Sequence, residues 1–344
     1  MKKKIALFLV LMLSLSLLFG CAQAEKATVN IAFLKGPTGM GASKLMADNE
    51  AGTTANAYNF TLAGAADVVI SQLVSGELDM AALPTNAIAS LYQKTEGGVQ
   101  ALAVNTLGVL YILERGDSVH SLADLEGKTI LSSGQGTTAQ AVTDYLLSAA
   151  GVNATVEYAA EHSEVVARAT AENAAYDVVL LPEPFVTMLT KQAPEFHVAL
   201  NLTEEWENQG AGLLPMGGIA VRREFAEANP EAVAAFLAEY AASVEWVNAN
   251  AEEAAALIEK YDIMKAAVAR DAIPRANMVC LTGDAMRVVL NSFYGVLEGF
   301  NVKLIGGAMP GEDFYYGATD GADAAVIGGA DGPTAIVVTE KTGE

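Results

Sequence analysis

The first segment whose residue types could do chemistry is the glycine-rich stretch Leu34–Lys44 (LKGPTGMGASK). A phosphate-binding loop would require GxxxxGK[ST], in which the lysine directly follows the second glycine and reaches the terminal phosphates. Gly36 and Gly41 have this separation, but Ala42 takes the lysine position and Lys44 comes two residues later. The dinucleotide pattern GxGxxG also lacks its last glycine here. The segment therefore does not predict a nucleotide-binding site.

Catalytic and metal-binding motifs are also missing from the sequence. No GxSxG, HExxH or CxxC pattern occurs. The three histidines, His120, His162 and His197, are scattered along the chain. Ser132 and Ser133 could follow a strand, but the sequence places no histidine beside them. We therefore expect a protein that is not an enzyme and that holds neither a metal nor a cofactor.

Length and charge limit the class of protein further. The chain has 344 residues, enough for about two domains of ~100–200 residues each. Its composition is that of a globular protein, and 41 acidic against 20 basic residues give a formal net charge of -21. A nucleic-acid partner is not expected, because binding a phosphate backbone depends on clustered Lys and Arg.

The N-terminus has the layout of a secretory signal. The basic residues Lys2–Lys4 precede the apolar run Ile5–Phe19, which is shorter than the ~20 residues of a membrane-spanning helix. The following LFGC segment resembles the lipobox of bacterial lipoproteins, in which the cysteine is acylated. We expect residues 1–20 to be a signal peptide, Cys21 to carry lipid, and 21–28 to be a linker. The protein would then be exported and anchored by this lipid at the outer face of the bacterial cytoplasmic membrane.

The second cysteine, Cys280, would then have no disulfide partner. It lies in the apolar run Met278–Leu281, and free cysteine is among the residue types most often buried. We interpret it as a small buried side chain rather than a reactive thiol.

Short β-rich segments alternate with segments of helical pattern, which predicts an α/β protein with mostly parallel sheets. Two later helices are expected, one beginning at Pro230 and one over Asp284–Glu298, each with an apolar stripe facing the core. The predicted strands are Val29–Leu34, Tyr58–Ala63, Met80–Leu83, Gln100–Asn105, Val109–Glu114, Thr129–Ser132, Thr155–Tyr158, Val178–Leu181 and Val198–Leu202.

The second half of this pattern repeats the first at a fixed offset. Each half has a Gly/Thr-rich turn after its first strand, and a later strand that starts after Asp and ends in Leu-Pro. Two copies of one βαβ plan predict a pair of related lobes rather than a solenoid. The pairs separated by 98 positions are Gly36 and Gly134, Asp79 and Asp177, Leu83 and Leu181, and Pro84 and Pro182.

The position of the glycine-rich turns after strands predicts a role in ligand binding. In open α/β sheets, ligands bind at the carboxyl ends of strands, where turns into helices leave backbone N–H groups unsatisfied. Thr38 and Gly39 lie in such a turn in the first lobe, and Gly136, Thr137 and Thr138 lie in its counterpart in the second. If the lobes face each other, one cleft collects both turns.

Several segments in order resemble solute-binding lipoproteins of ATP-binding cassette importers, in the branch related to sulfonate, nitrate, taurine and thiamine-precursor binding proteins. The resemblance runs from about Val29 to Tyr316. It is carried by FLKGPTGMG, FTLAGAADVVISQLVSGELDMAALPTNAIASLY, VNTLGVLYILERGDSVHSLADLEGKTI, LLPEPFVTML and VRREFAEANPEAVAAFLAEYAASVEWV.

This resemblance implies a bilobal type II periplasmic-binding-protein fold, in which two Rossmann-like α/β lobes are joined by a two-strand hinge. The hinge would lie near Glu114–Ser118 and near Gly217–Val221. The implied division is 29–115 and 217–317 for lobe 1, 116–216 for lobe 2, and 318–344 for a flexible or strand-adding tail. The tail contains IGGADGPT, which resembles a short motif in the β-subunit of sodium-translocating decarboxylases and carries no function over.

The resemblance also implies which residues would contact a solute. Hydroxyls, amides and helix N-termini can fix a small polar ligand while apolar walls bury it. Alternatives stay open: Thr38 and Thr137 could only cap helices, Asn105 could only close a turn, and Glu183 could be a solvated loop carboxylate. The turns favour an anion and Glu183 does not, so the charge of the solute is undecided. The candidate residues are Thr38, Gly39, Gly64, Ala65, Thr85, Asn86, Asn105, Gly134, Gly136, Thr137, Thr138 and Glu183.

The function implied is capture of a small polar organic or anionic solute and its delivery to an importer permease, by a monomer. One alternative is an enzyme on the same fold, as in menaquinone-pathway enzymes or pyrimidine synthases. The signal peptide and the single remaining cysteine count against it. Another alternative is a solute receptor that serves a sensor protein.

Overall fold

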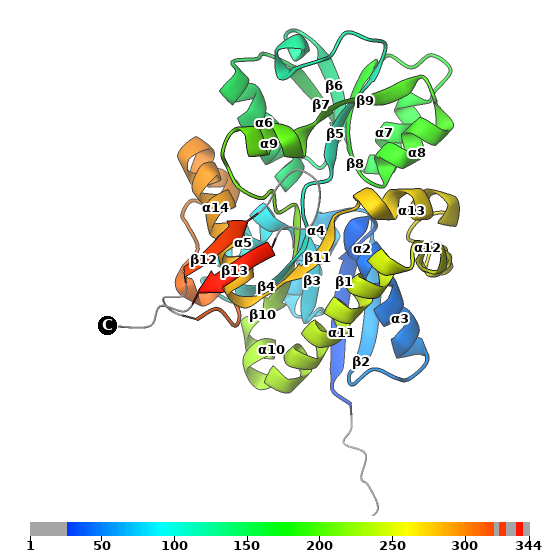
Figure 1. Ribbon diagram of the computed structural model, residues 1–344. Coiled ribbons are helices and arrows are strands. Elements are labelled where there is room, and N and C mark those ends of the chain that lie inside the picture. The colour runs from blue at the N-terminus through cyan, green and yellow to red at the C-terminus, as the bar shows by residue number, and fades with distance from the viewer. Residues whose placement is uncertain (1–25, 320–322, 328–334, 340–344) are drawn as a thin grey trace, which may run out of the picture.

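The computed structural model describes residues 26–319, 323–327 and 335–339. It has two α/β lobes, one above the other in Figure 1, each built around its own sheet. The signal peptide and Cys21 predicted from the sequence lie outside the described residues. Within the described ranges, no helix is long and apolar enough to cross a membrane.

Lobe 1 contains a six-stranded sheet in the order β11-β4-β10-β3-β1-β2. β1 runs parallel to β2 and β3, whereas β10 is antiparallel to both of its neighbours, β3 and β4. Its strands are β1 (Thr28–Leu34), β2 (Ala57–Ala63), β3 (Met80–Pro84), β4 (Val99–Thr106), β10 (Gly217–Arg222) and β11 (Met278–Leu281).

Lobe 2 contains a five-stranded sheet in the order β7-β6-β8-β5-β9. β6 is parallel to β7 and β8, and β5 is antiparallel to β8 and β9. Its strands are β5 (Leu110–Arg115), β6 (Thr129–Ser133), β7 (Thr155–Ala159), β8 (Val178–Pro182) and β9 (Phe196–Asn201).

The two sheets repeat one strand order, which agrees with the pair of related lobes that the sequence repeat predicts. When β2-β1-β3-β10-β4 is compared with β7-β6-β8-β5-β9, the strand in the fourth place is antiparallel in both lobes, and lobe 1 adds β11, antiparallel to β4, at its edge. The strand in the fourth place is the first one the chain forms after it arrives from the other lobe. β8 begins 98 residues after β3 begins, at Val178 and Met80, so the offset seen in the sequence is the offset between equivalent strands.

The division between the lobes differs from the expected one at its first boundary. β5 was expected to complete lobe 1, but it pairs with β8 and β9 in the sheet of lobe 2. The chain therefore crosses at 107–109, between β4 and β5, rather than at Glu114–Ser118. It returns at 209–216, just before β10. The cause is that Val109–Glu114 is an ordinary apolar strand, and only pairing decides which sheet an apolar strand joins.

Helices cover both faces of each sheet. Alternate residues of β1 show the division: Val29, Ile31 and Phe33 face the core beneath α3, α11 and α12, and Ala32 faces the core beneath α4, α5 and α14. The helices of lobe 1 are α2 (Pro37–Gly41), α3 (Ser43–Glu50), α4 (Ala66–Ser75), α5 (Thr85–Lys94), α10 (Arg223–Ala228), α11 (Pro230–Ala249), α12 (Ala251–Lys260), α13 (Ala266–Ala272) and α14 (Gly283–Asn301).

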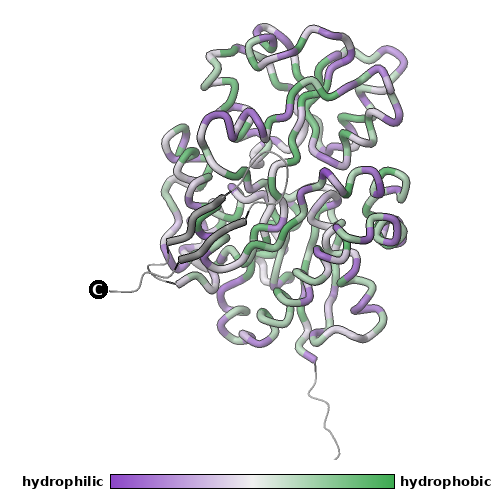
Figure 2. Tube along the Cα trace, in the orientation of Figure 1, coloured by the Kyte–Doolittle hydropathy of each residue, from purple (hydrophilic) through white to green (hydrophobic). Residues whose placement is uncertain are grey.

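In lobe 2, α7 and α8 pack on one face of the sheet and α6 on the other. Figure 2 shows the strands of both lobes largely in green and the outer loops largely in purple. The helices of lobe 2 are α6 (Thr138–Ala150), α7 (His162–Ala169), α8 (Phe185–Gln192) and α9 (Leu202–Asn208). The 3-10 helices of the chain's described part are η1 (Leu122–Leu125), η2 (Ile273–Arg275), η3 (Val302–Ile305) and η4 (Glu312–Phe314).

The two later helices have the buried stripes that their spacing predicts. On α11 the stripe includes Val233, Phe236 and Tyr240, and on α14 it includes Phe293 and Leu297, all buried. Near the C-terminus, β12 (Asp323–Ile327) and β13 (Ala335–Thr339) pair antiparallel with each other and form a separate sheet beside α14. In the described part of the chain they join neither large sheet.

Candidate functional site

A cleft of about 590 Å³ lies between the lobes. Lobe 1 lines it with residues at the carboxyl ends of β1, β2 and β3, and lobe 2 with residues at the carboxyl ends of β6, β7 and β8. Parallel strands end at one edge of a sheet, so the turns that follow them converge there. The volume is within the range of pockets that hold small molecules.

The cleft brings together eight of the twelve residues expected to contact a solute. Gly134 and Gly136 have φ angles of 76° and 79°, a backbone conformation that side chains with a Cβ rarely adopt. Their turn therefore depends on glycine. The eight lining residues are Thr38, Gly64, Ala65, Gly134, Gly136, Thr137, Thr138 and Glu183.

Thr85 and Asn86 are among the four candidates that do not line the cleft. Both are buried at the start of α5, where Asn86 bonds to the start of α6 in the other lobe and the Thr85 hydroxyl lies 3.2 Å from that of Thr138. Asn86 donates to the carbonyl of Gly136 at 3.0 Å and accepts from the hydroxyl of Thr138 at 3.1 Å. The Thr85 hydroxyl donates to the Pro215 carbonyl at 2.7 Å. In this structure both side chains join the lobes to each other.

Asn105 and Gly39 also lie outside the lining. Asn105 is completely buried in β4, and its Nδ2 has no hydrogen-bond partner among the described residues. It lies behind Gly217, where a Cβ would be 2.8 Å from its Oδ1. Gly39 is buried within α2.

The hydroxyls of Thr38 and Thr137 do line the cleft, but each already has a partner. Thr38 donates to the Leu34 carbonyl at 2.9 Å, and Thr137 donates to the Gly134 carbonyl at 2.5 Å. These bonds hold the two turns in shape. A solute would have to displace them to use either hydroxyl as a donor.

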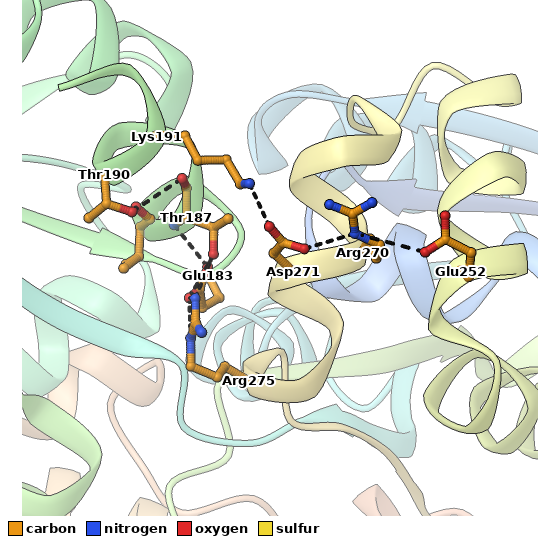
Figure 3. A network of polar contacts seen from close by, with 9 residues as sticks. Glu183, Thr187, Thr190, Lys191, Glu252, Arg270, Asp271 and Arg275 are labelled. Atoms are coloured by element: carbon orange, nitrogen blue, oxygen red, sulfur yellow. Dashed lines mark hydrogen bonds and ion pairs between the residues drawn. The ribbon is translucent and has the colours of Figure 1, made fainter. Parts of the chain in front are cut away.

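Glu183 is neutralised by the protein itself (Figure 3). Its carboxylate is fully buried and lies 2.7 Å from the guanidinium of Arg275, which belongs to lobe 1. It also accepts from the backbone N–H of Thr187 at 3.1 Å and from the Thr187 hydroxyl at 2.9 Å. A second ion pair, between Lys191 on α8 and Asp271 on α13 at 2.5 Å, also joins the two lobes. The Glu183 carboxylate therefore forms a buried ion pair between the lobes and is not a solvated loop carboxylate.

A serine and a histidine, which could not be paired from the sequence, meet in the cleft. Ser133 Oγ lies 2.5 Å from Nδ1 of His162, and both residues line the cavity. Burial lowers the pKa of His162 to about 4, because desolvation disfavours the charged imidazolium. Ser133 ends β6 and His162 follows β7, and these strands are parallel neighbours. The sequence does not show that these two strands are neighbours, and without that information Ser133 and His162 cannot be paired from the sequence.

More acidic than basic side chains line the cleft. Lys35, which lines it, pairs with Asp262 at 2.8 Å. Asp67 and Glu161 also line it, and neither forms an ion pair within the described ranges. The Glu161 carboxylate lies against Gly64 across the cleft, since a Cβ on that glycine would be 2.5 Å from Oε1. No group of three metal-ligating side chains occurs in the part of the chain that is described.

The position of Asn86 leads to a first prediction. Replacing Asn86 with alanine should lower the free energy of unfolding by about 1–3 kcal/mol, because it removes the hydrogen bonds that the buried Asn86 amide makes to the Gly136 carbonyl and the Thr138 hydroxyl. Urea unfolding measures this. Asn59→Ala is the control, because Asn59 is exposed and a surface change costs ~0.5 kcal/mol or less. Equal losses in the two variants would contradict the interlobe role.

Solved structures with the same fold are numerous. An ABC transporter protein of Parabacteroides distasonis is 18% identical with a TM-score of 0.70, over 84% of this chain and 99% of that one. The periplasmic aliphatic sulphonate binding protein SsuA of Escherichia coli is 16% identical with a TM-score of 0.66, over 81% and 94%. The nitrate-binding protein NrtA of Synechocystis is 18% identical with a TM-score of 0.52, over 69% and 67%. The predicted bilobal periplasmic-binding fold is confirmed.

Comparison of the sequence with protein-family models identifies the family of this chain. No curated protein matches the chain in sequence. A family model described as "Menaquinone biosynthesis" matches residues 56–276, a span that begins in lobe 1, contains all of lobe 2 and returns to lobe 1. Because this match takes in well over half of the chain, the protein belongs to that family.

Proposed function

We propose that the protein is an extracytoplasmic receptor that captures a small polar organic or anionic solute between its lobes and delivers it to an ABC importer permease. The observation that carries the proposal is the cleft of about 590 Å³ whose walls come equally from strand ends of both lobes. The solute-binding proteins that share the fold support it.

The mechanism is closure rather than chemistry. Within the described ranges, the chain passes between the lobes only at 107–109 and 209–216, so these two connections are where one lobe can rotate against the other. A solute that contacts both walls stabilises the closed arrangement only if it binds that arrangement more tightly than the open one. The permease would then read the closed surface.

Location and assembly belong to the same proposal. Residues 1–20 act as a signal peptide, lipid on Cys21 anchors the protein at the outer face of the cytoplasmic membrane, and the receptor works as a monomer. Intact-mass spectrometry of the membrane-extracted protein tests this anchor. A mature chain that starts at Cys21 and carries acyl groups is expected.

A thermal-shift screen of the mature protein tests solute capture. A ligand at 100 times its Kd should stabilise the fold by about 2.7 kcal/mol. Sulfonates, nitrate, thiamine precursors, purines and aromatic acids form the screen.

A matched pair of variants links any binding to the cleft. Ala65→Trp places a bulky ring in the lining and should abolish the shift. Val68→Trp, in the first turn of the helix that Ala65 precedes, but with the valine 62% exposed and outside the lining, should leave it unchanged. If both variants keep the thermal shift, the solute does not bind in this cleft.

An enzyme is the second candidate, and two observations favour it. The family model is described by a biosynthetic pathway, and a serine and a neutral histidine are hydrogen-bonded in the cleft. Mass spectrometry of each solute after incubation with the protein separates the candidates. Chemical conversion of a bound compound would replace the receptor with an enzyme. A receptor for a sensor protein would bind solute equally well but co-purify with the sensor instead of a permease.

A further inference from the structure

The hydrogen bond between Ser133 and His162 determines which ring nitrogen carries the proton. Ser133 is 1% exposed, and its hydroxyl has no partner other than His162 Nδ1 among the described residues. If Nδ1 were the donor, the hydroxyl proton of Ser133 would be buried without an acceptor, which is costly. The hydroxyl therefore donates to Nδ1, and the neutral ring carries its proton on Nε2.

His162 Nε2–H is left free for a ligand. The ring lines the cleft, and Nε2 makes no hydrogen bond within the described part of the chain. It packs against Phe185, with ring centroids 5.0 Å apart, and this fixes its plane. The Tyr158 hydroxyl, also in the lining and without a hydrogen-bond partner among the described residues, is a second neutral donor, and burial raises its pKa further, to about 12.

The other polar side chains buried or half-buried in the lining are already satisfied. The hydroxyls of Thr38, Thr137 and Thr138 donate to groups of the protein, and the Glu183 carboxylate is paired with Arg275. A solute oxygen therefore finds its unoccupied side-chain donors on one wall, in lobe 2.

No free cation accompanies these donors. Among the described residues, Lys35 is the only Lys or Arg in the lining of this cleft, and its ammonium group pairs with Asp262. The carboxylates of Asp67 and Glu161 add negative charge. A carboxylate or sulfonate that lost its water here would face these two carboxylates, and the lysine that it could reach already has an anionic partner. The backbone N–H groups at the start of α6 can bind an oxygen of either kind, so they do not reverse this preference.

We propose that Ser133 positions His162 so that Nε2–H binds an uncharged oxygen, such as the carbonyl of an amide or lactam on a planar ring. This proposal rests on the proposed receptor function. The ring of such a solute lies against Phe185, and the acidic lining disfavours the corresponding carboxylate. His162 is the specificity-determining residue of the cleft, and Ser133 is its positioning residue.

The ligand-free protein provides the first test. The ¹⁵N chemical shifts of the imidazole ring nitrogens distinguish the two neutral tautomers, and the His162 signals are assigned by their loss in His162→Phe. The Nε2–H tautomer is expected at neutral pH, and Ser133→Ala should convert it to a mixture. A dominant Nδ1–H tautomer, or no change in Ser133→Ala, overturns the proposal without reference to any solute.

The second test measures Kd for benzamide and benzoate by NMR titration. Benzamide should bind more tightly than benzoate. His162→Phe, which keeps a ring, should weaken benzamide about two- to tenfold, whereas His197→Phe, a change on the exposed face of β9, should not. Ser133→Ala removes one oxygen atom and should give a smaller loss, which keeps the test valid if His162→Phe folds poorly.

The outcomes separate this inference from the receptor function. Tighter binding of benzoate, unchanged affinity in His162→Phe, or no binding of benzamide at millimolar concentration overturns the assignment of solute class. The receptor function survives each of these results if another solute from the thermal-shift screen binds in the cleft and leaves unchanged.

Discussion

Replacing Trp206 with alanine is expected to lower the free energy of unfolding by about 3–5 kcal/mol, because a large buried side chain leaves a cavity that its neighbours fill only in part. Trp206 is fully buried on α9 of lobe 2. Its ring contacts Tyr145 on α6 and Phe293 on α14 of lobe 1, with centroids 5.2 and 5.5 Å apart. The side chain therefore stabilises both lobe 2 and its contact with lobe 1. Urea unfolding measures the loss.

The second tryptophan supplies the control, since the chain contains only two. Trp246 is partly buried on α11, so Trp246→Ala should cost about 1 kcal/mol, the centre of the range for single substitutions. Trp206→Phe should cost less than Trp206→Ala, because it keeps a ring and removes an indole N–H that has no partner in the described residues. A Trp206→Ala variant as stable as Trp246→Ala would show that α9 does not hold the lobes together.

Replacing Arg275 with alanine is expected to destabilise the protein by about 2 kcal/mol. The change leaves the buried carboxylate of Glu183 without its cation, and loss of one partner of a fully buried ion pair costs ~3–5 kcal/mol. The expected value is lower because the Arg275 side chain is 52% exposed and Glu183 keeps its bonds from Thr187. Equilibrium unfolding in urea at neutral pH measures the change.

Arg270→Ala is the matched control on the neighbouring helix. Arg270 forms exposed ion pairs with Glu252 and Asp271 (Figure 3), and exposed pairs contribute ~0–1 kcal/mol. In a Glu183→Gln background, Arg275→Ala should cost less than in the parent, because no uncompensated charge remains. If Arg275→Ala costs the same in both backgrounds, the guanidinium does not act through Glu183.

These contacts explain why eight of the twelve candidate solute residues line the cleft and four do not. Turns after parallel strands can be located from local sequence, and eight candidates from such turns do line the cleft. Whether a side chain in a turn faces the cleft or the other lobe depends on packing. Asn86 and Glu183 both follow or join a Leu-Pro strand end, yet one bonds to the start of α6 and the other to Arg275.

The sequence by itself determined the α/β alternation, the repeat at 98 positions, and the long helices with their buried stripes. Each of these depends on local periodicity and on turn residues, which neighbouring residues encode. The repeat predicted two lobes on one βαβ plan, and the structure shows that their sheets share a strand order.

Only the tertiary structure decided three other features. It placed β5 in the sheet of lobe 2, brought Ser133 to His162, and paired Glu183 with Arg275. Each joins segments that are far apart in sequence or that could satisfy their local pattern in more than one place. Such contacts are selected by the pairing of strands and by the need to satisfy buried polar groups, and neither is written in the spacing of residues along the chain.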